Sequence, residues 1–142
     1  MIEVYTDGGC SGNPGPGGWA YLIVDDRELP LENWGAEEST TNNRMELQAV
    51  IAALEKVSHI SAITVYTDSQ YVQKGITEWI KKWKSMGWKT SAKKPVKNQD
   101  LWRHLDALSD GLPITWVWVK GHAGNKYNER CDFLTQKAIA SL

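Results

Sequence analysis

The tetrapeptide Val-Tyr-Thr-Asp occurs twice in this chain, at Val4–Asp7 and again at Val65–Asp68. Each copy ends a run rich in β-branched and aromatic residues, Ile2–Thr6 and Ile63–Thr67, which is typical of a β-strand. The repeat therefore predicts two adjacent strands that present carboxylates at one edge of a sheet. Ionised carboxylates held that close repel one another unless a cation neutralises them. Because Mg²⁺ and Mn²⁺ prefer hard oxygen ligands, the repeat indicates a metal site.

Two further acids, Glu46 and Asp132, lie on predicted helices and are candidates for the same site. Each acid also has a simpler interpretation. Glu46 follows Asn43 by three residues and could complete a capping box, while Asp132 could complement the dipole of the last helix. Asp68 could cap the short helix after it, and Asp7 could be a turn residue. Convergence of all four from two strand ends and two helices favours one shared metal site.

Length and composition predict a single domain spanning residues 1–142. Apolar residues make up 42% of the chain and charged residues 23%, as in ordinary globular proteins. The N-terminal residues show no basic region leading into a long apolar stretch, and no apolar run approaches membrane-spanning length. We therefore expect a cytoplasmic protein with no membrane association. We also expect it to be a monomer. Cys10 and Cys131 are too few for a disulfide scaffold or a zinc site and are expected to be reduced.

Charge is distributed unevenly along the chain. The window from Lys74 to His104 holds nine Lys and Arg residues against two acids, a net charge of +7, which leaves −8 on the remainder. The positive residues are Lys74, Lys81, Lys82, Lys84, Lys89, Lys93, Lys94, Lys97 and Arg103. Most of them belong to a Trp- and Lys-rich insert at about residues 75–98, which we call the basic insert.

Tryptophans interleave with these lysines, and Trp79, Lys82 and Trp83 share one predicted helical face. One interpretation is a solvated basic helix whose tryptophans reach back to the core. The other is a nucleic-acid surface, on which cations including Lys82 and Lys84 meet phosphates and the rings of Trp79, Trp83 and Trp88 pack against sugars or bases. The tryptophans outside the insert at positions 102, 116 and 118 are expected in the core.

Hydrophobic periodicity predicts a mixed α/β domain. Strands are expected near 2–8, 18–26, 28–37, 63–67 and 115–119, with a turn at Asp25–Arg27. Helices are expected near 43–56, 69–74, 77–86, 99–109 and 127–140, with Asn98 as the N-cap of the fourth. The strand–helix alternation of the second half calls for right-handed crossovers and parallel pairing. One five-stranded sheet with helices on both faces is the predicted architecture.

The glycine-rich stretch 8–18 contains a match to G-x-G-x-x-A at Gly15, Gly17 and Ala20. A dinucleotide fingerprint must open a helix, whereas Trp19–Val24 has the pattern of another strand, so we reject that assignment. The stretch is then either a plain hairpin connection or a turn whose exposed amides meet a ligand backbone. Asn13 at its tip and Asp7 at its base favour the second.

Four motifs occur together in order: Tyr5–Gly8, Asn43–Leu47, Tyr66–Ser69 and Gly121–Asn125. Together they resemble the bacterial type I ribonucleases H over nearly the whole chain. The resemblance implies strand order 3-2-1-4-5, with strands 1–3 antiparallel and strands 4 and 5 parallel to strand 1. It also implies an endonuclease that hydrolyses the RNA strand of RNA/DNA hybrids with little sequence specificity, leaving 5′-phosphate and 3′-hydroxyl ends.

The resemblance places all four acids in the metal site of the family. Two Mg²⁺ ions, with Mn²⁺ as a substitute, would lie roughly 3.5–4 Å apart in the substrate complex and have different roles in catalysis. One would lower the pKa of a water and the other would stabilise the leaving oxygen. We assign Asp7 to bridging, Asp68 and Asp132 to the nucleophile side, and Glu46 to the leaving-group side.

His122 lies between Gly121 and Gly124 and has an ordinary pKa suited to proton transfer near neutrality. The alternative is a structural histidine that caps the final helix. The resemblance favours the catalytic role. One departure from the family is that Asp132 is followed by Phe133, where an acid is more usual, and this bears on how the last helix packs.

Short polar side chains around the acids are expected to select the substrate: Asn13, Asn42, Asn43 and Gln70. Amides both donate and accept hydrogen bonds, so they suit minor-groove base edges and the 2′-hydroxyls that distinguish RNA from DNA. Thr41 and Asn98 are candidates for holding a DNA phosphate, and Arg44 either serves that pocket or packs.

Two competing functions predict different sequences. A non-catalytic hybrid-binding module would be expected to lack at least one of the four acids. A resolvase or transposase core acting on DNA would not be expected to combine the basic insert with the loop Gly121–Gly124. Neither fits as well as a hybrid-cleaving nuclease.

Overall fold

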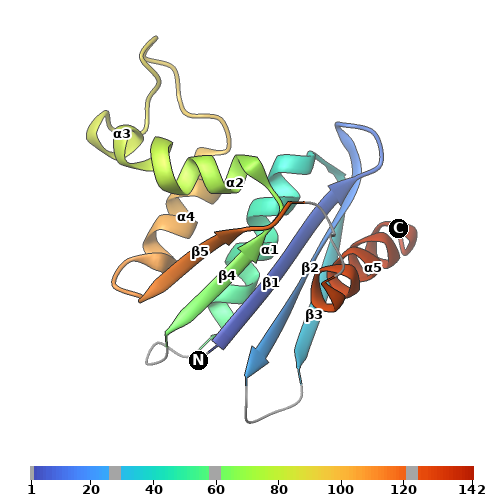
Figure 1. The fold of residues 1–142 in the computed structure, drawn as a ribbon. Helices are drawn as coiled ribbons and strands as arrows, with labels where there is room; N and C mark the ends of the chain where they lie inside the picture. The colour runs from blue at the N-terminus through green and yellow to red at the C-terminus, as the bar shows by residue number, and fades with distance from the viewer. Residues whose placement is uncertain (1, 26–29, 58–61, 121–124) are drawn as a thin grey trace.

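A five-stranded mixed sheet of order β3-β2-β1-β4-β5 forms the centre of the molecule (Figure 1). The computed structural model describes residues 2–25, 30–57, 62–120 and 125–142. β1 (Ile2–Cys10), β2 (Gly15–Asp25) and β3 (Leu31–Thr40) make an antiparallel meander. β4 (Ile63–Thr67) pairs in parallel with β1, and β5 (Ile114–Trp118) in parallel with β4. The predicted fold class and strand order are confirmed.

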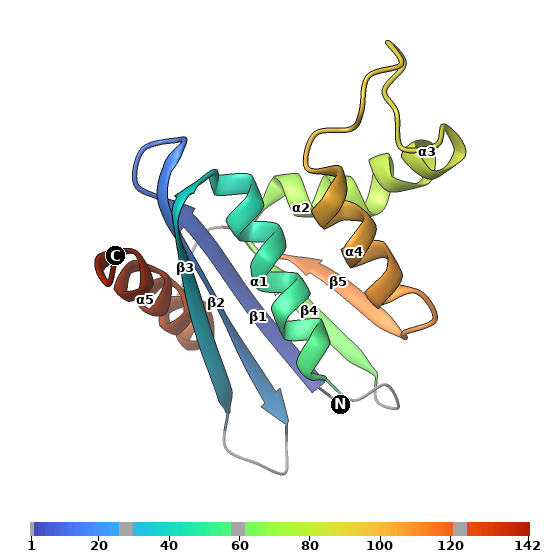
Figure 2. The ribbon, with the colours of Figure 1, turned by 180° about the vertical axis from the view of Figure 1, so that it is seen from behind.

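Helices cover both faces of the sheet. α1 (Asn42–Lys56) and α4 (Gln99–Ser109) lie on one face (Figure 2), and α5 (Lys126–Ala140) lies on the other. The predicted apolar stripe of α1 is confirmed, because Leu47, Val50, Ile51 and Leu54 are all buried in the main core. No helix among the described ranges is long and apolar enough to cross a membrane.

The meander is longer than its sequence pattern predicted. β1 continues to Cys10 and β2 begins at Gly15, so only residues 11–14 of the glycine-rich stretch lie between the two strands. Antiparallel pairing of Gly9 and Cys10 satisfies backbone groups where we expected the connection after the first strand. The β2 strand confirms that no dinucleotide-binding helix follows the glycines. Of the turn expected at Asp25–Arg27, residues 26 and 27 lie outside the described residues, and Asp25 itself ends β2.

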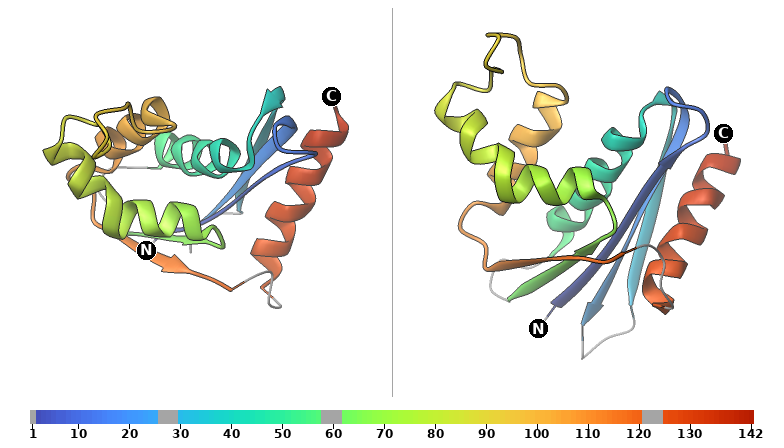
Figure 3. Two further views of the ribbon diagram at one scale, coloured as in Figure 1. Left: turned by 90° about the horizontal axis from the view of Figure 1, so that it is seen from above. Right: turned by 45° about the horizontal axis from the view of Figure 1, so that its top comes forward.

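The predicted gap between two helices at residues 75–76 was wrong. α2 (Gln70–Lys74), the π-helical turn η1 (Gly75–Trp79) and α3 (Ile80–Ser85) follow one another without a break. Gly75 packs directly against the fully buried Trp102, since a Cβ at residue 75 would lie 2.0 Å from Cη2 of that ring. The absence of a side chain there lets the helical run cross α4, and the rest of the basic insert extends away from the sheet (Figure 3).

Two expectations about tryptophans need correction. Trp102 is fully buried as predicted, but Trp116 and Trp118 are only half-buried. Trp116 packs against the edge of the main core. Trp118 instead donates its indole N–H to the main-chain carbonyl of Asp68 at 3.2 Å, so it supports the end of β4.

Candidate metal centre and nucleic-acid interface

A cleft opens where β1 outruns its parallel neighbour. β4 pairs with β1 only from Ile2 to Tyr5, whereas β1 continues to Cys10. From Thr6 onward, the β4-facing edge of β1 is therefore not covered by another strand. The cleft lies along this edge and has a volume of about 510 Å³. Its lining comprises Asp7, Gly8, Gly9, Cys10, Asn42, Asn43, Glu46, Asp68, Ser69, Gln70, Tyr71, Asp132 and Gln136.

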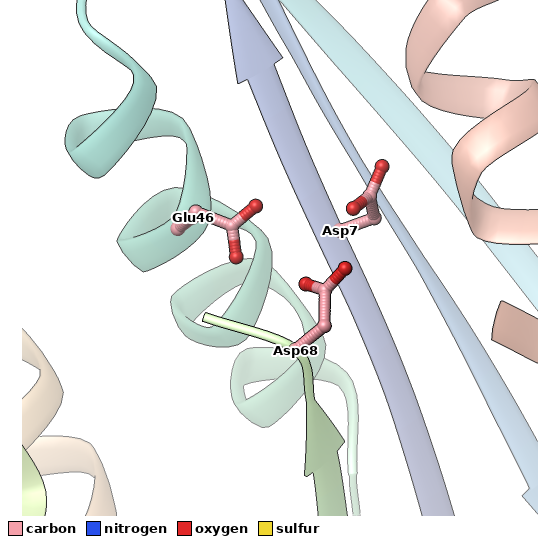
Figure 4. A group of neighbouring side chains, drawn as sticks. All are labelled: Asp7, Glu46 and Asp68. Atoms are coloured by element: carbon pink, nitrogen blue, oxygen red, sulfur yellow. The ribbon is translucent and has the colours of Figure 1, made fainter. Parts of the chain in front are cut away.

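Three carboxylates converge in this cleft from three elements. Asp7 comes from β1, Glu46 from α1 and Asp68 from the end of β4, and each offers an oxygen within 4.8 Å of the others. Their carboxyl groups lie around a common space (Figure 4). The stacked rings of Tyr5 and Tyr66, with centroids 4.6 Å apart, show the parallel register that aligns the two repeats. Asp7 and Asp68 therefore lie close together at the ends of adjacent strands, as the repeat predicted.

Glu46 is a buried acid with a specific orientation. Its Oε1 accepts a 2.7 Å hydrogen bond from the backbone N–H of Gly8, while its Oε2 is buried and has no hydrogen-bond partner among the residues that the structure describes. The capping-box alternative is wrong, because Thr41 is the N-cap of α1 and accepts from the backbone N–H of Arg44. Burial, followed by the nearby charges of Asp7 and Asp68, raises the pKa of Glu46 well above its usual range.

A hard divalent cation fits this donor set. An unpartnered buried carboxylate oxygen beside two more carboxylates is costly unless positive charge compensates it. Carboxylate oxygens are also the ligands that Mg²⁺ and Mn²⁺ prefer. Asp7, Glu46 and Asp68 are therefore the residues that would hold such an ion.

Replacing Glu46 with Gln should stabilise the metal-free protein at neutral and alkaline pH. The folded-state pKa of Glu46 is raised, so its ionisation costs stability as the pH rises from the ordinary glutamate value through the folded-state value. Glu46→Gln removes that cost, and Tm in a chelating buffer at pH 8 should rise by roughly 3–8 °C. The gain should vanish near pH 4, where both proteins are neutral at residue 46, and Mg²⁺ should stabilise only the wild type.

The matched control is Glu55→Gln, which removes an exposed charge from the same helix. Its Tm should follow that of the wild type at every pH. A gain for Glu46→Gln that does not depend on pH would contradict the ionisation account.

The fourth predicted acid, Asp132, lines the same cleft from α5 but lies outside the three-carboxylate group. It is the seventh residue of α5, two turns in, so the interpretation as a first-turn dipole acid is wrong. Asn125 caps α5 instead, with Oδ1 accepting from the backbone N–H groups of Tyr127 and Asn128. Ser69, not Asp68, caps α2.

The predicted substrate-binding amides gather around this cleft. Asn42, Asn43 and Gln70 line it. Asn13 lies beside them, since its Oδ1 accepts a hydrogen bond from the backbone N–H of Asn42 at 3.2 Å. The loop between β1 and β2 is thereby tied to the start of α1. Sequence reasoning missed Gln136, although its spacing of four residues from Asp132 was available as a signal.

Asn98 does not cap α4 with its side chain. It occupies the N-cap position in the left-handed region, with φ of 62°, and makes no side-chain capping bond. Its Oδ1 accepts from Arg44 Nη1 at 3.3 Å and its Nδ2 donates to the Tyr71 hydroxyl at 3.1 Å. Arg44 also forms a two-pronged ion pair with Asp100, at 2.8 and 3.0 Å. Arg44 therefore joins α1 to α4 rather than only packing.

The basic insert has an exposed lysine face and a row of half-buried aromatic rings. Lys82 and Lys84 are exposed, whereas Trp79, Trp83 and Trp88 are half-buried. Trp83 packs between Trp79 and the core residue Trp102, with tilted rings whose centroids lie 5.8 and 5.4 Å away. Trp79, Lys82 and Trp83 line one hollow of about 340 Å³, which confirms the predicted common face. The rest of its lining comprises Met86, Lys89, Thr90 and Ser91.

Trp88 is held by two residues that the sequence pattern did not single out. It adopts a left-handed backbone, with φ of 63°, which is uncommon for a bulky residue. Gln99 donates its side-chain amide to the Trp88 carbonyl at 2.8 Å, and the Arg103 guanidinium lies 5.7 Å from the ring centroid. α4 therefore holds the middle of the basic insert in place at Trp88. The predicted site residue His122 lies in 121–124, outside the described residues.

Comparison with known proteins decides the family. The sequence matches the RNase H family over residues 1–140. The chain belongs to the ribonuclease H family. It is 55% identical to the ribonuclease H of Treponema denticola, covering 99% of this chain and 98% of that protein. It is 56% identical to the ribonuclease H of Chromobacterium violaceum, covering 99% and 96%.

Solved structures of this family share the fold. LC9-RNase H1, described as a type 1 RNase H with the type 2 active-site motif, superposes with a TM-score of 0.86 at 33% identity, over 99% of this chain and 72% of that one. LC11-RNase H1, solved in complex with an RNA/DNA hybrid, gives a TM-score of 0.75 at 25% identity, over 99% and 98%.

Proposed function

We propose that this ribonuclease H family member is a metal-dependent endonuclease that hydrolyses the RNA strand of RNA/DNA hybrids. The observation that carries the proposal is a group of three carboxylates within 4.8 Å of one another in a cleft, with one buried oxygen unpartnered among the described residues. Tyr71, which lines this cleft, contacts the ring of Trp79 in the basic insert. The hybrid complex of LC11-RNase H1, which shares the fold, supports this substrate class.

Each group of residues has a proposed role. Asp7, Glu46, Asp68 and Asp132 would hold two Mg²⁺ ions, or Mn²⁺ in their place. Bound there, the ions would supply an activated water and stabilise the leaving oxygen, so that cleavage leaves 5′-phosphate and 3′-hydroxyl ends. His122 is proposed, from the sequence alone, to transfer a proton.

The amides of Asn13, Asn42, Asn43 and Gln70 would contact the minor groove and the 2′-hydroxyls. Thr41 and Asn98 would hold a phosphate of the DNA strand, beside the guanidinium of Arg44. Recognition by backbone and groove width predicts little base-sequence preference.

The test compares cleavage of end-labelled substrates with and without Mg²⁺. A hybrid should be cut in its RNA strand only when the metal is present, while duplex DNA, duplex RNA and single-stranded RNA should remain intact. Ligation and phosphatase treatment of the products identify their ends. Cleavage of the hybrid in a chelating buffer, or equal cleavage of duplex DNA, would overturn the proposal.

Replacing four insert lysines with Ala should raise KM by roughly 10- to 100-fold with little change in kcat. The four are Lys81, Lys82, Lys84 and Lys89, all exposed on the basic insert. Their charges would bind the ground state and the transition state alike. The variant makes fewer phosphate contacts and therefore releases fewer counterions when it binds. The slope of log affinity against log salt concentration should become shallower by up to about 3.

The matched control replaces two lysines outside the insert, Lys56 on α1 and Lys137 on α5, with Ala. Its salt slope should equal that of the wild type. An unchanged slope in the four-lysine variant would favour the simpler interpretation of the insert as a solvated helix.

A further inference from the structure

α5 lines the cleft with two polar side chains one helical turn apart. Asp132 and Gln136 are four residues apart and therefore share a helix face, and both line the cleft. Gln136 is exposed. The next residue, Lys137, points elsewhere, since its ammonium lies 5.9 Å from the ring centroid of Trp34 on β3. α5 thus contributes one neutral amide to the cleft lining besides Asp132.

The cleft floor beside this amide is bare backbone. Gly9 follows Asp7 by two residues on β1, and a Cβ placed on it would lie 4.0 Å from Gln136 Nε2. As β1 runs from Asp7 to Gly9, α5 runs alongside from Asp132 to Gln136. Asn42 lines the same cleft from α1, on the opposite face of the sheet. A strand laid over the acids and along this floor would therefore pass between amides on both sides.

A primary amide at this position suits RNA in particular. It carries no charge, so it neither repels phosphates nor competes with a divalent ion for the carboxylates. It both donates and accepts hydrogen bonds, as does a 2′-hydroxyl. We propose that Gln136 is a specificity-determining residue that hydrogen-bonds a 2′-hydroxyl of the RNA strand close to the cleaved bond. The inference rests on the proposed function and adds a contact from α5 to those from α1.

The test is a double-mutant cycle that combines a substitution in the protein with a 2′-deoxy modification in the substrate. Hybrids with one cleavage site and a single 2′-deoxynucleotide, placed in turn at each of the positions flanking that site, are cut by wild type and by Gln136→Ala under single-turnover conditions. We expect the variant to cleave the all-RNA strand about tenfold more slowly. At one position, the 2′-deoxy substitution should slow the wild type to a similar extent but slow Gln136→Ala no further.

Further measurements separate this contact from other roles. Gln136→Ala should keep the wild-type Tm and the wild-type Mg²⁺ titration curve, which a structural or metal-holding role would change. Gln136→Glu, of the same size but charged, should bind the hybrid more weakly than the Ala variant. Lys137→Ala, the control on the same helix, should keep the wild-type pattern of 2′-deoxy sensitivity.

The outcomes also separate this inference from the proposed function. If the wild type does not cleave the hybrid, the proposed function itself fails. If the wild type cleaves but the two changes multiply at every position, or Gln136→Ala cleaves the all-RNA strand at the wild-type rate, only the role of Gln136 is overturned.

Discussion

Asp7→Asn should reduce kcat/KM for hybrid cleavage in Mg²⁺ by at least about 10³-fold while leaving the fold intact. Asp7 is buried at the open edge of β1. One of its carboxylate oxygens lies within 4.8 Å of a carboxylate oxygen of Glu46 and of Asp68. The amide keeps the shape of the side chain but removes the negative charge that would hold the ions. Stabilisation of transition-state charge by such ions is worth several kcal/mol, and each 1.4 kcal/mol is about tenfold in rate.

Stability in a chelating buffer separates lost chemistry from lost folding. The charge of Asp7 is one cause of the raised pKa of Glu46, so its removal relieves repulsion in the metal-free protein. Tm of Asp7→Asn should therefore equal or exceed that of the wild type. Glu55→Gln, which removes an exposed charge from α1, should retain full activity. Cleavage by Asp7→Asn within tenfold of the wild type would overturn the metal assignment.

Gly8→Ala should destabilise the protein by about 1–3 kcal/mol and lower Tm by roughly 3–10 °C. A Cβ at residue 8 would lie 2.4 Å from the carbonyl carbon of Met45 and 2.5 Å from the backbone nitrogen of Glu46. These are backbone atoms of α1, so the helix must move away from β1. That movement would stretch the hydrogen bond from Gly8 to Glu46, and we expect hybrid cleavage to fall by about tenfold or more.

The adjacent glycine provides the control for stability. A Cβ at Gly9 would meet its nearest neighbour, Cγ2 of Thr135, at 3.5 Å, an ordinary van der Waals distance. Gly9→Ala should therefore keep the wild-type free energy of unfolding within about 0.5 kcal/mol. Thermal and urea unfolding of both variants check the contrast. Equal stability of the two variants would contradict a tight contact between β1 and α1.

Much of the fold follows from local patterns because its elements are regular. The alternating runs before Asp7 and Asp68 correctly predicted strands β1 and β4. The apolar stripe from Leu47 to Leu54 correctly predicted the buried face of α1. The tight group of Asp7, Glu46 and Asp68 agrees with their predicted proximity. The roles of these acids and of the substrate-binding residues remain predictions.

The errors arose where tertiary contacts outweigh local preference. Asn98 has a side chain typical of a helix cap, but Arg44 and Tyr71, distant in sequence, engage it instead. A glycine such as Gly75 usually favours a break in a helix. Here it lies inside a continuous helical run, because the ring of Trp102 leaves no room for a side chain. In each case the deciding partner belongs to another element, which periodicity within one segment cannot reveal.

The parallel register of β1 and β4 determines where this protein can tolerate changes in length. Tyr5 pairs with Tyr66, and each aspartate follows its tyrosine by two residues. Because side chains alternate along a strand, inserting or deleting one residue between a tyrosine and its aspartate would turn that carboxylate to the other face of the sheet. An insertion at the far end of the basic insert, near residues 91–93, would leave both registers unchanged. Length variation among homologues should therefore concentrate in the connections and be excluded from these two strands.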